Sequence, residues 1–178
     1  MEISILVIVS MLILSAFFSG MEIAYVSSNK IHIEIEKKQN DLLAKVLQRI
    51  THRPSKFITT MLVGNNIALV VYGLFMGDLL MEFIPLGGMT GLLLQTVIST
   101  LVILLTAEFL PKVFFQIYAN KLIKVFAIPA YFFYLLFSVI SEFVIWISDL
   151  VLKVFFKTKA GSLLEKNISN HTTNISNI

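Results

Sequence analysis

The sequence predicts an all-α integral membrane fold, with three transmembrane helices accompanied by juxtamembrane or belt helices. Hydrophobic residues make up 57% of the chain, whereas soluble domains contain about 45–50% apolar residues. The stretches 3–26, 57–77 and 89–111 are apolar and long enough to cross a hydrocarbon core of roughly 30 Å. A segment rich in Lys and Arg separates the first two stretches, and short basic loops favour the cytoplasmic side.

The first span carries polar residues toward its end. Ser15, Ser19 and Glu22 lie at i, i+4 and i+7 and therefore share one helical face. Gly20, beside them, permits close approach of another helix. These residues either line a cavity or form small contacts between helices. The amino terminus lacks the basic residues that begin a signal peptide, so we expect a retained helix, with a cleaved signal peptide as the alternative.

Residues 29–56 form the most polar segment. Ile31, Ile33 and Ile35 alternate as in a strand, whereas the apolar residues of 42–50 recur at helical spacing. We favour an amphipathic helix that lies along the membrane surface and is broken before Pro54. Its basic face is expected to be solvated, with no role in binding nucleic acid.

The second span contains two adjacent amides, Asn65 and Asn66, directly after Gly64. An amide without a partner in hydrocarbon costs several kcal/mol, so both side chains need hydrogen bonds. They either bond neighbouring helices or point into the same cavity as Glu108 in the third span. The following segment, 78–88, is acidic and is expected to form a loop on the outer face.

The third span is expected to end on a carboxylate and a proline. An ionisable residue such as Glu108 within a span is costly and marks a candidate functional site. Pro111 cannot donate a hydrogen bond to the carbonyl of Ala107, so a backbone oxygen is freed next to Glu108. Both are hard oxygen ligands suited to a cation. A Glu108 held by a lysine would instead favour a simple helical anchor.

The region 119–156 is ambiguous. Its apolar part, 127–156, has lysines on both sides, so a simple crossing would leave one basic cluster outside. We therefore expect broken juxtamembrane helices that begin and end on the cytoplasmic side, with a fourth crossing as the alternative. The polar tail, 157–178, is expected to be a linker to cytosolic domains that the chain lacks. This topology puts the amino terminus outside and the carboxyl terminus in the cytoplasm of a multi-pass cell-membrane protein.

The polar residues of the spans offer only oxygen ligands. The chain has no Cys, and His32, His52 and His171 lie outside the spans, which disfavours zinc or copper. Oxygen ligands suit Mg2+, which commonly uses one or two carboxylates. No catalytic function is expected, because Ser19 has no His in any span, although a hydrolase remains a weak alternative.

Three motifs resemble one known family. Phe18-Ser19-Gly20-Met21-Glu22, Leu62-Val63-Gly64-Asn65-Asn66 and Ala107-Glu108-Phe109-Leu110-Pro111-Lys112 follow in the order and spacing of the CNNM/CorC magnesium transporters. The resemblance covers residues 1–155, so we take 1–156 as a transmembrane domain of this type. It implies three spanning helices with juxtamembrane helices, a homodimer, and export of Mg2+ with sodium exchange as the proposed driving force.

The resemblance also implies a metal site. The family's Ser, Gly-Asn and Glu-before-Pro correspond to Ser19, to Gly64 and Asn65, and to Glu108. Ala107 departs from the family, which often has Gly there. The chain also stops before the family's nucleotide-binding domains, so no ATP site is expected in it.

The sequence thus predicts Mg2+ efflux by alternating access in the lipid bilayer, with Na+ as a candidate coupling ion. We assign Glu108, Ser19 and Asn65 as the main ligands. Further ligands are Asn66, Ser15 and the Ala107 carbonyl, and the candidates for a cavity or coupling-ion role are Glu22, Gly20, Gly64 and Pro111. The alternative is a membrane scaffold or regulator that transports nothing, in which the polar residues only hold helices together.

Overall fold

The computed structural model describes residues 2–39, 42–83 and 87–156, and all their regular elements are helices. The expected all-α membrane fold is confirmed. The chain divides into two units, Met1–Ser141 and Glu142–Ile178. The expected linker, 157–178, lies outside the described residues.

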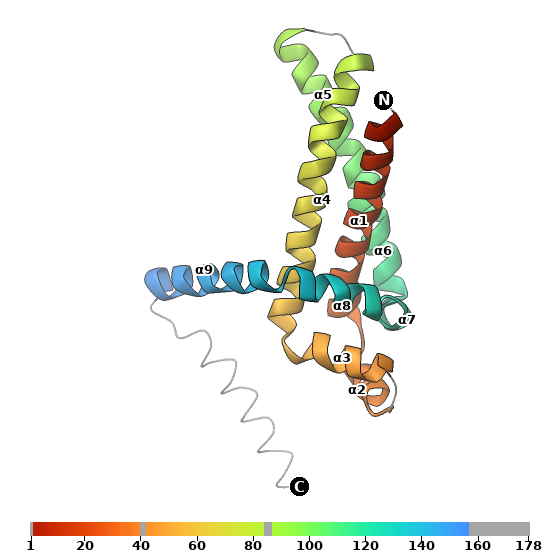
Figure 1. Ribbon diagram of the computed structural model, residues 1–178, viewed down its shortest axis with the longest axis vertical. Coiled ribbons are helices and arrows are strands. Elements are labelled where there is room, and N and C mark those ends of the chain that lie inside the picture. Colours follow the sequence, from red (N-terminus) through yellow and green to blue (C-terminus); the bar gives the residue numbers. More distant parts are fainter. Residues whose placement is uncertain (1, 40–41, 84–86, 157–178) are drawn as a thin grey trace. The chain divides into compact units, whose positions relative to one another are not determined.

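Within the described residues, three helices are long and apolar enough to span a membrane. They are α1 (Glu2–Ser27), α4 (Pro54–Phe83) and a continuous helix, Gly88–Ile117. The last consists of α5 (Gly88–Ile103), the π-helix η1 (Leu104–Phe109) and α6 (Leu110–Ile117). Figure 1 shows α1 beside α4, and both η1 and α6 also contact α1. The expected spans 3–26, 57–77 and 89–111 fall within these helices.

Two helices extend further than expected. Helix α4 continues through Asp78 to Phe83, so much of the expected acidic loop is helical. The third helix does not end at Pro111 but continues to Ile117. A proline ring crowds the carbonyl four residues earlier in an α-helix, and here the turn before it is widened. The Leu110 N–H donates to the Leu105 carbonyl, five residues back, so the wider turn accommodates Pro111 without ending the helix.

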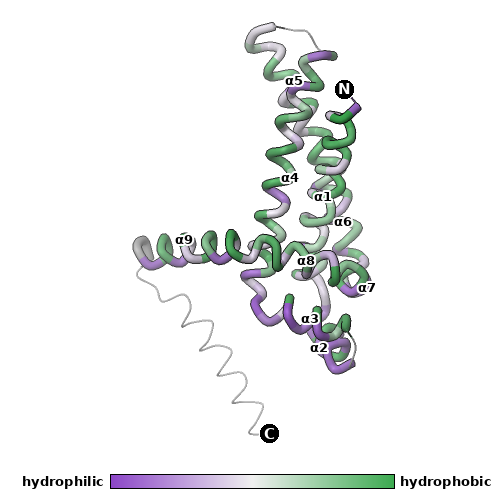
Figure 2. Tube along the Cα trace, viewed as in Figure 1, coloured by the Kyte–Doolittle hydropathy of each residue, from purple (hydrophilic) through white to green (hydrophobic). Residues whose placement is uncertain are grey.

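The polar segment forms two helices, α2 (Lys30–Lys37) and α3 (Leu42–His52). The Asn29 side chain caps α2 by accepting a hydrogen bond from the Ile31 N–H, so the alternating isoleucines form a helix and not a strand. Helix α3 ends at His52, and Pro54 begins α4. Figure 2 shows hydrophilic residues concentrated on α2 and α3, and apolar residues along α1 and α4.

The third helix is followed by α7 (Ala119–Val125), α8 (Ala127–Leu136) and α9 (Ser138–Phe156). The segment expected to be broken is therefore divided into separate helices. Helices α7 and α8 meet at an angle of 63°, and by length and composition the pair also qualifies as one broken span.

The core of the first unit is rich in aromatic residues. The Phe18 ring is buried and packs edge-on against Phe133, with 4.8 Å between ring centroids. Phe115 of α6 stacks on Phe126 at 5.6 Å. Buried apolar residues of α3, such as Leu47 and Ile50, belong to the same cluster. This core holds the second half of α1 against α4, α6 and α8, and it thereby positions the polar residues of α1.

Candidate functional site

The predicted polar residues of α1 and α4 meet in the core. The Ser15 hydroxyl donates a 2.6 Å hydrogen bond to Oδ1 of Asn65, and both side chains are buried. A short bond between a hydroxyl and an amide joins the two spans, because neither group has water to bond within a packed apolar contact. The structure thus brings together two of the predicted ligands, from residues 50 positions apart.

Ser19 lies one turn further along the same face of α1. Its side chain is buried, and among the described residues its Oγ has no hydrogen-bond partner. Burying an unpaired hydroxyl costs free energy, so native structures rarely leave one without a ligand, a water or a functional reason. Ser19 is therefore the described polar group that most clearly calls for an additional partner.

Two predicted glycines allow the helices around these oxygens to approach closely. A Cβ built on Gly64 of α4 would lie 2.7 Å from the Phe18 ring of α1. A Cβ on Gly20 of α1 would lie 2.5 Å from the ring of Phe115 in α6. Both distances are shorter than non-bonded carbon atoms tolerate, so each glycine is needed for the packing of an aromatic ring.

The remaining predicted ligands divide between interior and surface. Ala107, in η1, is fully buried, and the carbonyl of this residue cannot receive a hydrogen bond from Pro111. Asn66 is exposed, on a different face of α4 from Asn65. The structure therefore places Asn65 with Ser15 and does not place Asn66 there. Pro111 lines an apolar cavity of about 580 Å³, together with residues of α1 and α8, and not a polar one.

Glu108 lies in η1 beside Lys112, a cation that the sequence analysis did not assign to the site. Lys112 Nζ is 3.6 Å from Glu108 Oε2, and the two side chains are 40% and 32% exposed, respectively. The i, i+4 spacing was the available signal, because such residues are neighbours on a helix surface. Glu22 of α1 interacts electrostatically with both Lys112 and Glu108. Two acids and one lysine, from α1 and the third helix, therefore lie near one another.

The site as a whole offers hydroxyl, amide and carboxylate oxygens. Within the described ranges, no three His, Cys, Asp or Glu side chains form a group able to hold a metal. Neutral oxygens with one or two carboxylates are a ligand set that Mg2+ accepts. The widened turn at η1 is also significant, because π-turns within α-helices occur frequently at functional sites.

A family model described as the Cyclin M transmembrane N-terminal domain (CNNM) matches residues 6–170. The UPF0053 inner membrane protein YfjD of Escherichia coli is 25% identical over 147 residues, which cover 81% of this chain and 32% of that protein. The UPF0053 protein MG146 of Mycoplasma genitalium is 28% identical over 157 residues, covering 84% of this chain and 36% of that protein.

A UPF0053 protein of Haemophilus influenzae is 27% identical over 116 residues, covering 65% of this chain and 27% of that protein. The chain thus spans about a third of the length of these curated relatives. The family match covers all three candidate spans except the first few residues of α1, and it includes every residue of the site described above. This multi-pass membrane protein therefore belongs to the CNNM family, as a Cyclin M transmembrane N-terminal domain.

Proposed function

We propose that this chain is the membrane domain of a divalent-cation transporter that exports Mg2+ by alternating access. The observation that carries the proposal is the buried hydroxyl of Ser19, which has no hydrogen-bond partner among the described residues and lies one turn from the Ser15–Asn65 hydrogen bond. A transported cation would supply the missing partner. The membership of the CNNM family and the resemblance to CNNM/CorC magnesium transporters support the same conclusion.

In this proposal the cation is cargo and binds between α1, α4 and η1. Ser19 and Asn65 would provide neutral oxygens and Glu108 the charge. Lys112 now lies beside Glu108, which is the arrangement that a simple anchor would have. However, a contact of 3.6 Å between two partly exposed side chains is weak, so a divalent ion can displace the lysine. Pro111 and Gly20 are the points where the helices would bend during transport.

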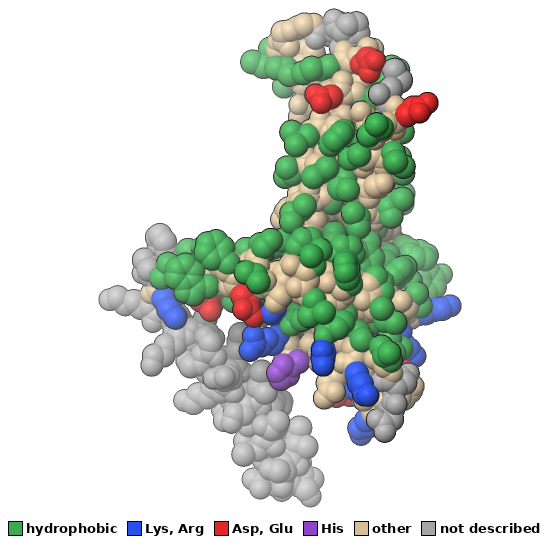
Figure 3. Space-filling view, in the orientation of Figure 1, with side chains coloured by type: hydrophobic (Ala, Val, Ile, Leu, Met, Phe, Trp, Pro, Cys, Tyr) green, Lys and Arg blue, Asp and Glu red, His purple; other side chains and the backbone are tan. Residues whose placement is uncertain are grey.

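The charge distribution supports the proposed orientation. On the face drawn in Figure 3, the Lys and Arg side chains gather at one end, and the charged side chains seen at the other end are acidic. The basic end includes α3, and the acidic end includes Asp78 and Glu82 of α4. Because Lys and Arg favour the cytoplasm, we propose that the amino terminus lies outside and α3 inside. We further propose a homodimer, Na+ as the coupling ion, no enzymatic activity, and no ATP site in this chain.

Two contacts favour a second candidate function, a membrane scaffold or regulator that transports nothing. The Ser15–Asn65 hydrogen bond joins two helices without any ion, and Lys112 already provides a counter-charge for Glu108. Polar side chains commonly hold transmembrane helices together in this way. The scaffold and the transporter differ in whether the carboxylate of Glu108 is needed for flux.

The deciding experiment is Mg2+ flux in proteoliposomes, with and without a sodium gradient. Glu108→Gln is expected to abolish flux, while Glu82→Gln, at the opposite end of the unit, is expected to retain it. Dependence of wild-type flux on the sodium gradient would support Na+ coupling. Equal flux in wild type and Glu108→Gln, or no flux above empty liposomes in either, would leave the scaffold as the better description.

A further inference from the structure

A cavity of about 270 Å³ lies between α4 and α5, beyond the Ser15–Asn65 contact along α4. On the α4 side it is lined by Gly73 and Gly77, and no atom of a neighbouring described residue lies within 4 Å of a Cβ placed on either glycine. The missing side chains therefore leave space open. On the α5 side, four polar residues line the cavity, and they are Gln95, Thr96, Ser99 and Thr100. One wall of a cavity between two apolar spans is thus polar.

Three of these polar side chains have no hydrogen bond to another described residue. The Thr96 hydroxyl donates to the Leu92 carbonyl at 2.8 Å, whereas the described residues give no such partner to the Gln95 amide or to the Ser99 and Thr100 hydroxyls. Gln95 is nevertheless only 8% exposed. An amide without a partner is costly in hydrocarbon. The cavity is therefore expected to hold water or a polar ligand and not an acyl chain.

Tyr72 separates this cavity from the candidate site. It follows Asn65 by seven residues and so lies on the same face of α4, two turns further along. Its side chain is fully buried, and its hydroxyl donates to the Ser99 carbonyl at 3.3 Å, at the wall of the cavity. Hydrogen bonds between hydroxyl and carbonyl groups are typically about 2.7–2.8 Å long, so this contact is weak. The ring therefore lies between Asn65 and the cavity along α4, held by a contact that is easily broken.

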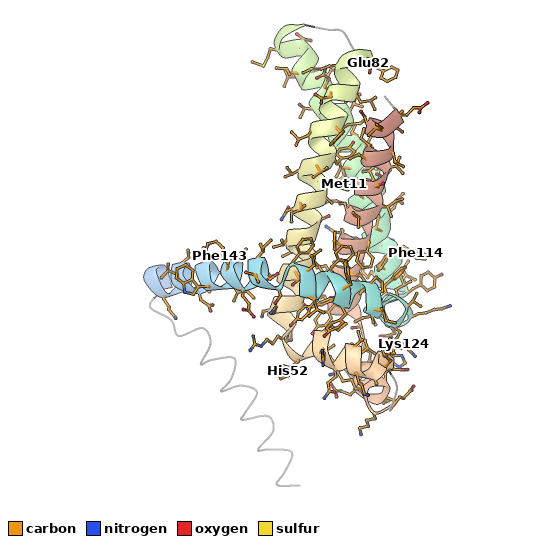
Figure 4. The ribbon with its side chains drawn as sticks, viewed as in Figure 1. Met11, His52, Glu82, Phe114, Lys124 and Phe143 are labelled. Atoms are coloured by element: carbon orange, nitrogen blue, oxygen red, sulfur yellow. The ribbon has the colours of Figure 1, made fainter. Side chains whose placement is uncertain are left out.

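The end of α4 next to the cavity is acidic. Asp78 directly follows the lining residue Gly77, Glu82 lies one turn beyond Asp78, and both acids are exposed. No Lys or Arg occurs in residues 57–111, so the charge that these helices place near the cavity is negative. Figure 4 labels Glu82 at one end of α4 and His52 near the other. Exposed carboxylates raise the local concentration of cations.

We propose that this cavity is the outer vestibule of the transport path, where a divalent cation is held together with its shell of water. The inference rests on the proposed function. Mg2+ gives up its waters reluctantly and usually keeps several of them. The waters of such an ion donate hydrogen bonds, which the amide oxygen of Gln95 and the hydroxyl oxygens of Ser99 and Thr100 accept. The cavity has room for the shell, because a water takes about 30 Å³ in the liquid. A lining without charge holds the hydrated ion weakly, which suits a point of release.

The test uses single cysteines, since the chain has none of its own. Thr100→Cys places a thiol in the cavity. Leu101→Cys, the matched control, places one on the next residue, which is 51% exposed and does not line the cavity. A membrane-impermeant cationic methanethiosulfonate is added outside intact cells that express the chain. The reaction requires the thiolate, which apolar surroundings disfavour, so Thr100→Cys should be labelled about tenfold faster than Leu101→Cys.

The hydrated ion is tested by protection. Mg2+ and hexaamminecobalt(III), an inert ion that resembles hydrated Mg2+ in size and shape, should both slow the labelling of Thr100→Cys, compared with choline chloride at the same ionic strength. Adding Gln95→Leu should keep the labelling and reduce this protection. Equal labelling rates in all three salts would overturn the cation site. Labelling of Thr100→Cys no faster than that of Leu101→Cys would show that the cavity is not hydrated.

Two further outcomes concern the surroundings of the cavity. An oxidative cross-link between two copies of Thr100→Cys, without labelling, would mean that a second copy fills the cavity. Labelling only in inverted vesicles would place the cavity on the cytoplasmic side. Either result would overturn the vestibule. Labelling and protection require no transport, so protection without flux would reject the proposed function and keep the cation site, whereas flux without protection would reject only the cation site.

Discussion

The Ser15 hydroxyl and the Asn65 amide oxygen lie 2.6 Å apart in the buried contact between α1 and α4. Hydrogen bonds between transmembrane helices contribute on average about 0.6 kcal/mol in double-mutant cycles. We expect a coupling energy of this size, favouring the pair, in a cycle of Ser15→Ala and Asn65→Leu. The measurement is the free energy of unfolding in detergent, with the helix content as the monitored signal.

Asn66→Leu provides the control for that cycle, because Asn66 is the neighbouring amide but is exposed. It should show no coupling to Ser15→Ala. A coupling energy for Asn66 as large as that for Asn65 would mean that the two amides have been assigned to the wrong faces of α4.

Gly64→Ala should destabilise the contact between α1 and α4. The new Cβ would lie 2.7 Å from the Phe18 ring, which packs against Phe133 at 4.8 Å and has little room to move. Overpacking of this kind typically costs about 1–3 kcal/mol. Thermal unfolding in detergent should show a lower midpoint.

The matched control is Gly73→Ala in the same helix, because no atom of a neighbouring described residue lies within 4 Å of a Cβ placed there. Alanine favours helix over glycine by roughly 0.5–1 kcal/mol, so this variant should be neutral or slightly stabilising. A similar loss of stability in both variants would show that the Phe18 contact does not explain the effect.

Lys112→Met should strengthen the binding of Mg2+ if the lysine competes with the ion for Glu108. An ion pair with both side chains partly exposed contributes about 0–1 kcal/mol, so the stability of the ion-free protein should change little. The measurement is the Mg2+ concentration that gives half of the maximal thermal stabilisation, and it should decrease.

Lys121→Met, in α7, removes the same charge from an exposed position. It should leave the half-maximal Mg2+ concentration near that of the wild type. A weaker response to Mg2+ in Lys112→Met than in Lys121→Met would contradict competition between lysine and ion.

The ion pair between Glu36 and Lys124 is expected to hold α2 against α7. The atoms are 2.7 Å apart, and the Glu36 side chain is only 10% exposed. Among the described residues, Lys124→Met would leave the carboxylate with His32, 3.8 Å away, as its ionisable partner, at an expected cost of about 1–3 kcal/mol. Hydrogen exchange of the α2 amides should become faster.

Adding Glu36→Gln to Lys124→Met removes the buried charge and should restore part of the lost protection. Exchange in α2 that is no faster in Lys124→Met than in the wild type would show that the Asn29–Asn120 hydrogen bond and apolar packing suffice to hold the helix.

The sequence was sufficient to predict the helical membrane fold, because apolar runs of spanning length leave few alternatives. It also identified the polar residues that the structure brings together. The residue pattern of the span did not separate Asn65 from Asn66, and only the family resemblance favoured Asn65, because the packing of α1 is what selects one face of α4. The Glu36–Lys124 pair joins residues 88 positions apart, so no local pattern indicated it.

The sequence analysis ended the third helix too early, at Pro111, for a different reason. A proline removes one donor and crowds one carbonyl, and this led to the expectation of a helix end at Pro111. The π-turn relieves the same conflict while the helix continues. Local rules therefore located the irregularity correctly but not its form.

The widened turn at Leu104–Phe109 has a consequence for the register of the whole third helix. It accommodates one residue more than an α-turn, and each residue advances an α-helix by about 100°. Deleting a single residue there would restore regular winding and leave the side chains beyond it, including Lys112, close to their present direction, because the wider turn absorbs the extra residue. The π-turn thus lets the sequence contain one residue more without changing the face that α6 presents to α1.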